Sequence, residues 1–437
     1  MPAQDCDVFV IGGGPAGSTV SALLASQGHR VVLVDKDHHP RFHIGESLLP
    51  ANLPLLDRMG VGEAVRAIGM PKPGAEFVSP QHSHTQTYYF ADAWDKTMPG
   101  AYQVRRADFD HILLNNARTR GVEVFEGTRA VDVQWDAPGR KVASVTTRDD
   151  NGASATWRPR FLIDASGRDT FLAGRLKIKT KNPDHNSAAV YAHFQNAQRL
   201  PGQDAGNISV FWFEHGWFWF IPLHDGATSV GMVTWPYHMK SRGERSLSDF
   251  LLDNIRQCPA LAQRLAQATL CTEAEAAGNY SYSATQCHGD NFLLLGDAYA
   301  FIDPVFSSGV WLAMSGGEVG AEVVHACLSS PERAKTELAR FDRHMRLGPR
   351  AFSWFIYRMT NPTMRGFFMQ PHNPLRMKEA LLSVLAGDLF GRTPIWPSLW
   401  AFKALYFSVN LVHPRRAWRA WRQRRGNVQA APAQTGA

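Results

Sequence analysis

The first 35 residues of the chain contain two short apolar runs on either side of a segment of small residues. Residues 6–11 and 30–34 are rich in Val, Ile and other apolar residues, which predicts two buried strands. Residues 18–27 are rich in Ala, Leu and Ser and predict a helix that ends at Gly28. The pattern therefore predicts a strand–turn–helix–strand unit of an α/β fold.

The apolar positions of the remaining chain predict a mixture of helices and further strands. Helical spacing is found at 51–69, 103–114, 246–270 and beyond about residue 340. Strand patterns are found at 75–105, 122–133, 141–148, 161–163, 187–235 and 292–295. We expect the helical segment at 246–270 to face solvent.

The turn that follows the first strand carries glycines at positions i, i+2 and i+5, which are Gly12, Gly14 and Gly17. Glycines with this spacing permit a tight bend, a close approach of a pyrophosphate and close packing of the helix on the strand. The helix start at Pro15 and Ala16 offers unpaired N–H groups to phosphates. Asp35 ends the second strand and can accept the hydroxyls of a ribose. We predict a dinucleotide site, with a ligand-free Gly-rich turn as the alternative.

A second polar turn follows the buried strand at 292–295. Gly296 and Asp297 lead into a loop, and the sequence Ser307-Ser308-Gly309 then begins a helix. Asp297 can accept ribose or ribityl hydroxyls, and the amides at the helix start can face an anion or a flavin edge. Because this strand is far in sequence from the first one, we expect the nucleotide domain to be assembled from discontinuous segments.

The run from Trp217 to Pro222 has the most unusual composition of the chain, Trp-Phe-Trp-Phe-Ile-Pro. Alternation places Trp217 and Trp219 on one face of a strand and Phe218 and Phe220 on the other. Both faces are apolar, which predicts a buried strand. An ordinary core strand is the alternative to a functional one.

Lys72 stands between two prolines, which hold it in a stiff extended segment. From composition alone, a solvated surface lysine is the simpler interpretation. Arg41 is equally open, because it can pair with a phosphate or a ribose edge or lie on the surface.

The bulk composition fits a globular enzyme with two or three sub-domains in 437 residues. The 13 Trp and 25 Phe can line an apolar pocket for a flat substrate. The five cysteines are widely spread without a CxxC pair, which predicts a reducing cytosol and no disulfide or metal site. No signal peptide, membrane span or nucleic-acid motif is recognisable, so we expect a cytoplasmic protein that binds no nucleic acid.

Much of the net charge of +7 lies near the C-terminus, where residues 411–425 combine Arg and Trp in a basic amphipathic segment. Such a segment can bind an anionic membrane surface or an acidic protein. A terminal helix that docks its tryptophans on the body of the protein is slightly favoured. Residues 426–437 are expected to be disordered.

Taken together, these motifs resemble the flavin-dependent halogenases, within the wider FAD monooxygenase fold, over most of residues 5–330. The resemblance implies an α/β fold with a Rossmann-like FAD-binding domain similar to that of p-hydroxybenzoate hydroxylase, formed by 1–70, 105–180 and 285–335. A β-sheet substrate domain, 71–104 and 181–284, is inserted into it. A helical C-terminal region, 336–425, completes the chain.

Two motifs distinguish halogenases from other FAD proteins. Trp217 to Pro222 fits the family signature WxWxIP, and Lys72 lies where the family carries its essential lysine. The resemblance implies FAD contacts from Gly12, Gly14, Pro15, Ala16, Gly17, Asp35, Lys36, Arg41, Ser47, Arg106, Asp297, Pro304, Gly309 and Val310. It implies halide contacts from Ser308 and Gly309, and a substrate tunnel lined by Trp217, Trp219, Pro222 and Phe306.

Phe306 stands where the branch that halogenates free tryptophan has a glutamate. The chain is instead similar to the branch that acts on phenols, pyrroles or carrier-protein-bound aromatics. A further similarity to halogenase-like proteins of aryl polyene pigments points to pigment or antibiotic biosynthesis. It also points to a hydroxyaryl substrate, tethered as an acyl thioester.

The resemblance implies that FADH2 from a separate NAD(P)H flavin reductase activates O2, and that chloride or bromide is converted to hypohalous acid, which Lys72 delivers to the ring. Delivery as a haloamine needs a neutral amine, and burial would lower the lysine pKa from about 10.4. His43, His82 and Glu76 remain open as the catalytic base. The competing interpretations are an FAD-dependent aromatic hydroxylase, a flavin reductase similar to geranylgeranyl reductase, and a non-catalytic flavoprotein scaffold.

Overall fold

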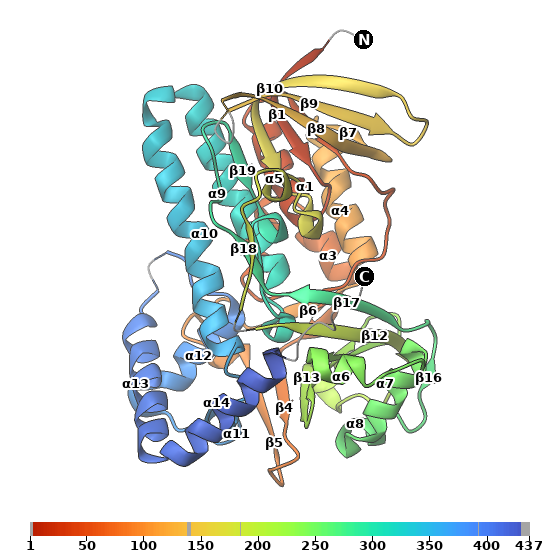
Figure 1. The fold of residues 1–437 in the computed structure, drawn as a ribbon, viewed down its shortest axis with the longest axis vertical. Helices are drawn as coiled ribbons and strands as arrows, with labels where there is room; N and C mark the ends of the chain where they lie inside the picture. Colours follow the sequence, from red (N-terminus) through yellow and green to blue (C-terminus); the bar gives the residue numbers. More distant parts are fainter. Residues whose placement is uncertain (1–2, 138–140, 184, 392, 430–437) are drawn as a thin grey trace, which may run out of the picture. The chain divides into compact units, whose positions relative to one another are not determined.

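The computed structural model describes residues 3–137, 141–183, 185–391 and 393–429 (Figure 1). The chain divides into two compact units, each built from three separate segments. Unit 1 comprises Met1–Ile68, Val104–Lys181 and Tyr282–Ala351. Unit 2 comprises Gly69–Gln103, Asn182–Ser281 and Phe352–Ala437, so the later C-terminal helices belong with its β-sheet.

Unit 1 is built on a seven-stranded sheet with the order β7-β2-β1-β10-β9-β8, in which β19 also pairs with β10. Five strands are parallel: β1 (Gln4–Ile11), β2 (Val31–Val34), β7 (Glu123–Phe125), β10 (Ser154–Asp164) and β19 (Phe292–Leu294). The antiparallel strands are β8 (Thr128–Ala137) and β9 (Lys141–Asp149). Figure 1 shows β1, in red, beside β10, in yellow.

Two long helices pack against α1 in unit 1, because its first turns consist of small residues. α1 (Pro15–Ser26) packs against α4 (Arg106–Thr119) and α9 (Gly309–Ser329). The shorter helices are α2 (Asn52–Arg58), α3 (Gly62–Ile68) and α5 (Phe171–Arg175). A small sheet contains β11 (Lys179–Lys181), β18 (Tyr282–Ala284) and β20 (Ala300–Phe301). The strand–turn–helix–strand prediction for the N-terminus is thus confirmed.

Unit 2 is built on an eight-stranded sheet with the order β16-β12-β15-β14-β13-β4-β5, in which β17 also pairs with β12. Its strands are β4 (Gly74–Val78), β5 (Thr85–Tyr89), β12 (Ser187–Gln195), β13 (Ile208–Phe213), β14 (Gly216–Pro222), β15 (Thr228–Thr234), β16 (Thr269–Leu270) and β17 (Glu275–Tyr280). Only β13 and β4 pair in parallel. The strands β3 (Met70–Lys72) and β6 (Ala101–Gln103) form a separate pair.

One face of this sheet is covered by three helices, two of which lie in the segment that the sequence predicted to face solvent. The helices are α6 (Pro236–Lys240), which was not predicted, and α7 (Leu247–Arg256) and α8 (Pro259–Arg264), which lie within 246–270. Phe250, Leu251 and Leu261 are fully buried and belong to one core with Phe218 and Phe220. The helical prediction for 246–270 is confirmed for α7 and α8, but its orientation was wrong, because their apolar residues cover the Phe face of β14.

The C-terminal part consists of helices, as expected beyond residue 340. They are α10 (Ala334–Ile356), which runs from unit 1 into unit 2, α11 (Pro362–Met369), α12 (Met377–Ala386), α13 (Trp396–Val412) and α14 (Pro414–Gln429). None of the helices that the structure describes is long and apolar enough to cross a membrane.

Two expectations about the C-terminus were wrong. Residues 426–429, predicted to be disordered, belong to α14, because the preceding Arg and Gln residues favour helix. The remaining predicted tail, 430–437, lies outside the described residues. Trp418 and Trp421 are not buried against the body of the protein, since both are more than half exposed, although Trp421 lines a cavity together with Tyr357. Small residues on the same helix, Ala417 and Ala420, are less exposed than either tryptophan.

Candidate active site

The Gly-rich turn of unit 1 is packed too closely for side chains at two of the three glycines with the i, i+2 and i+5 spacing. Gly12 has φ +101°, and a Cβ there would lie 2.3 Å from the carbonyl oxygen of Ala165 at the end of β10. A Cβ at Gly17 would lie 1.8 Å from the carbonyl oxygen of Gly12. At Gly14 the nearest atom is Nη2 of Arg41, at 3.8 Å, so this glycine faces open space next to a guanidinium. The turn therefore leaves room for a ligand at its middle glycine.

Asp35 at the end of β2 is buried and closes this turn. The backbone N–H of Gly13 donates to its Oδ2 at 2.6 Å, and that of Asp37 donates to its Oδ1 at 2.9 Å. Nη2 of Arg41 lies 3.9 Å from Oδ2. Each carboxylate oxygen can accept more than one hydrogen bond, so room for a ribose hydroxyl remains. Asp35 thus also fixes the turn, a role that the sequence analysis did not assign.

The two basic residues predicted near this turn have acidic partners. Arg41 is partly buried, and its Nη1 lies 3.7 Å from Asp110. Nζ of Lys36 donates to Asp169 at 2.6 Å in an exposed ion pair. Arg41 therefore lies next to Gly14, whereas Lys36 forms its ion pair at the protein surface.

Arg106 uses its guanidinium to hold other protein groups. It donates to both oxygens of Asp110, at 2.8 and 2.9 Å, and to the carbonyl of Ile44, at 2.8 Å. Burial raises the pKa of Asp110, but the charge and hydrogen bonds of Arg106 outweigh it and hold that pKa below its usual range. Arg106 therefore positions the loop that leads to Ser47. The sequence analysis missed Asp110, although its i+4 spacing from Arg106 on a helix was a usable signal.

The second polar turn lies at the start of α9 in the same unit. Burial raises the pKa of Asp297 to about 6. A 3₁₀ helix, Pro304–Phe306, precedes Ser307, whose φ is +56°. The hydroxyl of Ser308 is buried and has no hydrogen-bond partner among the described residues. A Cβ at Gly309, the first residue of this 21-residue helix, would meet nothing within 4 Å.

Lys72 lies in unit 2 at the end of β3 and is almost completely buried, with 2% of its surface exposed. Its Nζ lies 5.2 Å from the centroid of the Phe90 ring. Burial lowers the pKa of Lys72 to about 7. The interpretation of Lys72 as a solvated surface lysine is therefore wrong, because the strand pair β3–β6 and the chain around Phe90 enclose it.

The Trp-containing strand β14 is buried along its whole length, as predicted. The indole N–H of Trp219 donates to Oγ of Ser229 at 3.1 Å, and the rings of Trp217 and Trp219 are 6.1 Å apart. Gly231 lies opposite Trp219 on β15, where a Cβ would meet the indole ring at 2.1 Å. The alternation also holds, since Phe218 and Phe220 lie in the core on the opposite face.

The three candidate bases differ in their surroundings. Glu76 accepts from Nη2 of Arg264 at 2.9 and 2.7 Å, so its charge is already paired. Burial lowers the pKa of His82, whose Nδ1 lies 3.0 Å from Oγ of Ser79. Burial and, to a lesser extent, the charge of Arg106 lower the pKa of His43 to about 4. Glu76 is therefore the poorest candidate for a free base.

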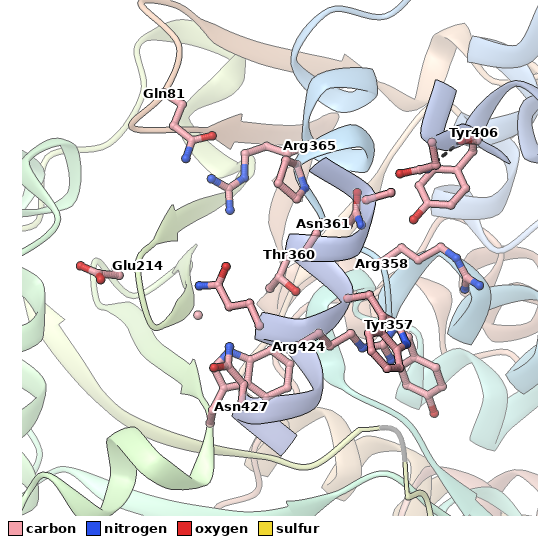
Figure 2. Close-up of a pocket in the computed structure, with 18 of the residues that line it drawn as sticks. Gln81, Glu214, Tyr357, Arg358, Thr360, Asn361, Arg365, Tyr406, Arg424 and Asn427 are labelled. Carbon is pink, nitrogen blue, oxygen red and sulfur yellow. Dashed lines mark hydrogen bonds between the residues drawn. The ribbon is translucent and has the colours of Figure 1, made fainter. Parts of the chain in front are cut away.

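A cavity of about 590 Å³ in unit 2 contains none of the predicted site residues. Figure 2 shows that Arg365 extends toward Gln81, whereas Arg424 comes from α14. Nε of Arg365 is buried without a hydrogen-bond partner among the described residues. The sequence analysis gave no signal for this cavity, because its walls come from distant segments.

Known proteins resemble the chain over most of its length. The FAD binding domain family matches residues 5–318. The flavin-dependent halogenase armH3 of Armillaria mellea is 38% identical over 346 residues, which cover 74% of this chain and 68% of the relative. A 1H-pyrrole-2-carbonyl-[peptidyl-carrier protein] chlorinase of Pseudomonas fluorescens is 28% identical over 89% of this chain and 91% of that protein. A tryptophan 2-halogenase of Chondromyces crocatus is 34% identical over 74% and 61%.

Among solved structures, the myxobacterial chondrochloren halogenase CndH is similar with a TM-score of 0.77 and 33% identity. The similarity covers 90% of this chain and 93% of that chain. The α/β fold and the glycine turn thus define an FAD-binding protein. With armH3 and CndH as relatives over most of the chain, it belongs to the flavin-dependent halogenases.

The residues of unit 1 fit FAD. The open middle glycine at Gly14 gives a pyrophosphate access to the backbone, with Arg41 beside it. Asp35 lies where an adenosine ribose is bound in such folds. The unpartnered hydroxyl of Ser308 and the N-terminal N–H groups of α9 are the kinds of donor that an anion binds.

Proposed function

We propose that this halogenase installs chlorine or bromine on an electron-rich aromatic ring, and that Lys72 delivers the halogen as hypohalous acid. The burial of Lys72, with a pKa of about 7, carries the proposal. At neutral pH a large fraction of such amines is uncharged, whereas a solvated lysine, with a pKa near 10.4, is almost fully protonated. A neutral amine can form a haloamine or accept a hydrogen bond from hypohalous acid, and an ammonium group can do neither.

The flavin side of the reaction is assigned to unit 1. When bound, reduced FAD supplies the oxidising power by reacting with O2. A separate NAD(P)H flavin reductase produces the reduced FAD, which reaches this protein by diffusion. The residues that would hold it are Gly12, Gly14, Pro15, Ala16, Gly17, Asp35, Lys36, Arg41, Ser47, Arg106, Asp297, Pro304, Gly309 and Val310. Ser308 and Gly309 would bind the halide with a hydroxyl and a helix N-terminus.

The aromatic residues are assigned to the enclosure of the oxidant. Trp217, Trp219 and Pro222 would shield the substrate side, and Phe306 would shield the flavin side. Hypohalous acid reacts with water and with exposed nucleophiles, so an apolar enclosure protects it on its way to the ring. The burial of all of β14 supports this assignment.

The substrate is proposed to be a phenolic or other hydroxyaryl group, held as a thioester on an acyl carrier protein. The relative that acts on a carrier-bound pyrrole supports the tether. Phe306, in place of the glutamate of the tryptophan branch, supports a substrate other than free tryptophan. The proposed location is the cytoplasm, where a flavin reductase and a carrier protein are available.

The test is an assay with a flavin reductase, bromide and a panel of free and carrier-loaded hydroxybenzoyl compounds, with tryptophan as a competitor. The bromine isotope pattern in the product mass spectrum reports halogenation. We expect Lys72→Met to abolish halogenation while FAD binding and peroxide release continue. Lys96→Met, at an exposed lysine of the same unit, should leave halogenation unchanged.

Three outcomes would contradict all or part of the proposal. Halogenation by Lys72→Met would exclude the lysine as the delivering group. Products that gain oxygen but never halogen would favour the alternative, an FAD-dependent aromatic hydroxylase. Preferred bromination of tryptophan would contradict the substrate class alone.

A further inference from the structure

The large apolar side chains that remain exposed in this protein are concentrated in two adjacent helices. Among the described residues, α13 and α14 contribute seven of them: Trp400, Leu405, Phe407, Leu411, Val412, Trp418 and Trp421. Leu411 and Val412, at the junction of the two helices, are 79% and 72% exposed. Figure 1 shows α13 and α14 as consecutive blue helices near the end of the chain. Large exposed apolar residues that gather in consecutive helices are typical of an interaction site.

α13 is apolar on both of its sides. Leu399, Phe402 and Tyr406 are buried against unit 2, and the only charged residue of the helix is Lys403. The exposed Trp400, Phe407 and Leu411 recur at helical spacing and share the opposite face. A helix that is apolar all round is normally covered on every side. Within the part of the chain that the structure describes, the exposed face of α13 therefore lacks a covering partner.

The same region carries the positive charge of the protein. Residues 389–437 contain eight Lys and Arg and no Asp or Glu, whereas the preceding part of the chain has a net charge of −1. On α14 the guanidinium groups of Arg422 and Arg425 lie 5.2 and 5.3 Å from the ring centroids of Trp418 and Trp421. Arg415, Arg416 and Arg419 on this helix are also exposed. Exposed apolar residues and positive charge thus occur together on α13 and α14.

We propose that α13 and α14 form a peripheral attachment site for an anionic phospholipid surface. The exposed apolar residues insert at the level of the headgroups, and the arginines bind the lipid phosphates. Tryptophan suits this position because its ring is apolar and its N–H is polar. The described helices include none that could span a bilayer, so the attachment is from one side.

Each of the other candidate partners matches only one of the two properties of this surface, its charge or its apolar residues. An acidic carrier protein would match the arginines of α14 but not the apolar stripe of α13. A second copy of the chain could bury the stripe, but it would bring two strongly basic segments together. An anionic membrane satisfies both features. The proposal does not depend on the substrate or on Lys72.

The test is co-flotation of the full-length protein with phosphatidylcholine vesicles that contain roughly one-third phosphatidylglycerol, and with pure phosphatidylcholine vesicles as a comparison. We expect binding to the anionic vesicles that is at least about tenfold stronger than to neutral ones and that falls as salt rises. Substitution of Arg415, Arg419 and Arg422 by Gln should remove the preference for anionic lipid. Leu411→Ser with Trp418→Ser and Trp421→Ser should remove binding to both.

Matched substitutions elsewhere are the controls. Arg256→Gln and Arg158→Gln remove exposed arginines outside the surface, and Leu270→Ser removes an exposed leucine, so none of them should change vesicle binding. Equal binding to neutral and anionic vesicles, or no binding, would overturn the proposal. A dimer that light scattering detects, and that the apolar substitutions dissociate, would assign the surface to a second copy of the chain. Displacement of the protein from vesicles by an acidic carrier protein would assign the surface to the carrier protein.

Discussion

At the scale of single residues, the burial of Lys72 lowers the free energy of unfolding by an amount that can be measured. Its pKa of about 7 in the folded protein lies below the ordinary value of 10.5. The unfolded chain therefore binds more protons between these two pH values, and the free energy of unfolding rises with pH across that window. Lys72→Met removes this loss of stability.

We expect Lys72→Met to raise the free energy of unfolding by about 1–4 kcal/mol near pH 7, and by less near pH 9.5. The reason is that the wild-type amine becomes neutral in a growing fraction of unfolded chains as pH rises. Urea unfolding of both proteins at the two pH values measures the difference. A gain that is equal at both pH values would contradict a lowered lysine pKa.

Gly17 permits a second test at this scale. Gly17→Ala places a methyl group 1.8 Å from a backbone oxygen, so the turn must shift and FAD binding should be lost. Flavin fluorescence measures the loss of FAD binding, and thermal unfolding measures the effect of the shifted turn on stability. The matched control is Gly174→Ala in α5, where a Cβ meets nothing within 4 Å. That substitution should retain FAD and stabilise the helix by about 0.5–1 kcal/mol.

Individual residues also show how far a sequence can be interpreted. The spacing of Gly12, Gly14 and Gly17 predicted the turn, because Gly12 and Gly17 leave no space for a side chain next to the backbone and Gly14 leaves space for a ligand. The burial of Lys72 could not be derived from its flanking prolines, because it depends on strand pairing and on Phe90, which is distant in sequence. Only the family resemblance singled out Lys72.

At the scale of elements, β14 is the best predicted part of unit 2. Its alternating Trp and Phe residues require two covered faces, and the structure provides them. The partner of Trp219, Gly231, was not predictable, since cross-strand register leaves no local signal. For α14 the helix was predicted but its buried side was not, because Ala and Trp are both apolar.

The pairing of Trp219 with Gly231 predicts the effect of a single methyl group. Gly231→Ala places a Cβ 2.1 Å from the indole ring, so Trp219 must leave its position and its hydrogen bond to Ser229. We expect a loss of about 1–3 kcal/mol in unfolding free energy and a changed near-ultraviolet circular dichroism spectrum. Gly278→Ala on β17, where a Cβ has open space, is the control. An unchanged spectrum in Gly231→Ala would contradict the pairing.

At the scale of the whole molecule, the two units are linked through the course of the chain. Two segments of unit 2, Gly69–Gln103 and Asn182–Ser281, are preceded and followed in the sequence by segments of unit 1. If unit 2 unfolded alone, a folded unit 1 would hold the ends of both segments and close them into loops. Closing a loop of about 100 residues removes roughly 4.7 kcal/mol of chain entropy, a large part of a typical domain stability. We therefore expect the two units to unfold together.

This coupling can be measured with FAD, because the proposed FAD residues lie in unit 1 whereas ten of the 13 tryptophans lie in unit 2. FAD at 100 times its dissociation constant should stabilise the folded protein by about 2.7 kcal/mol. We expect the melting temperature reported by tryptophan fluorescence, and hence by unit 2, to rise together with the calorimetric one. Gly17→Ala, which should not bind FAD, should show neither rise. If FAD raised the calorimetric melting temperature but left the melting temperature from tryptophan fluorescence unchanged, the units would unfold independently.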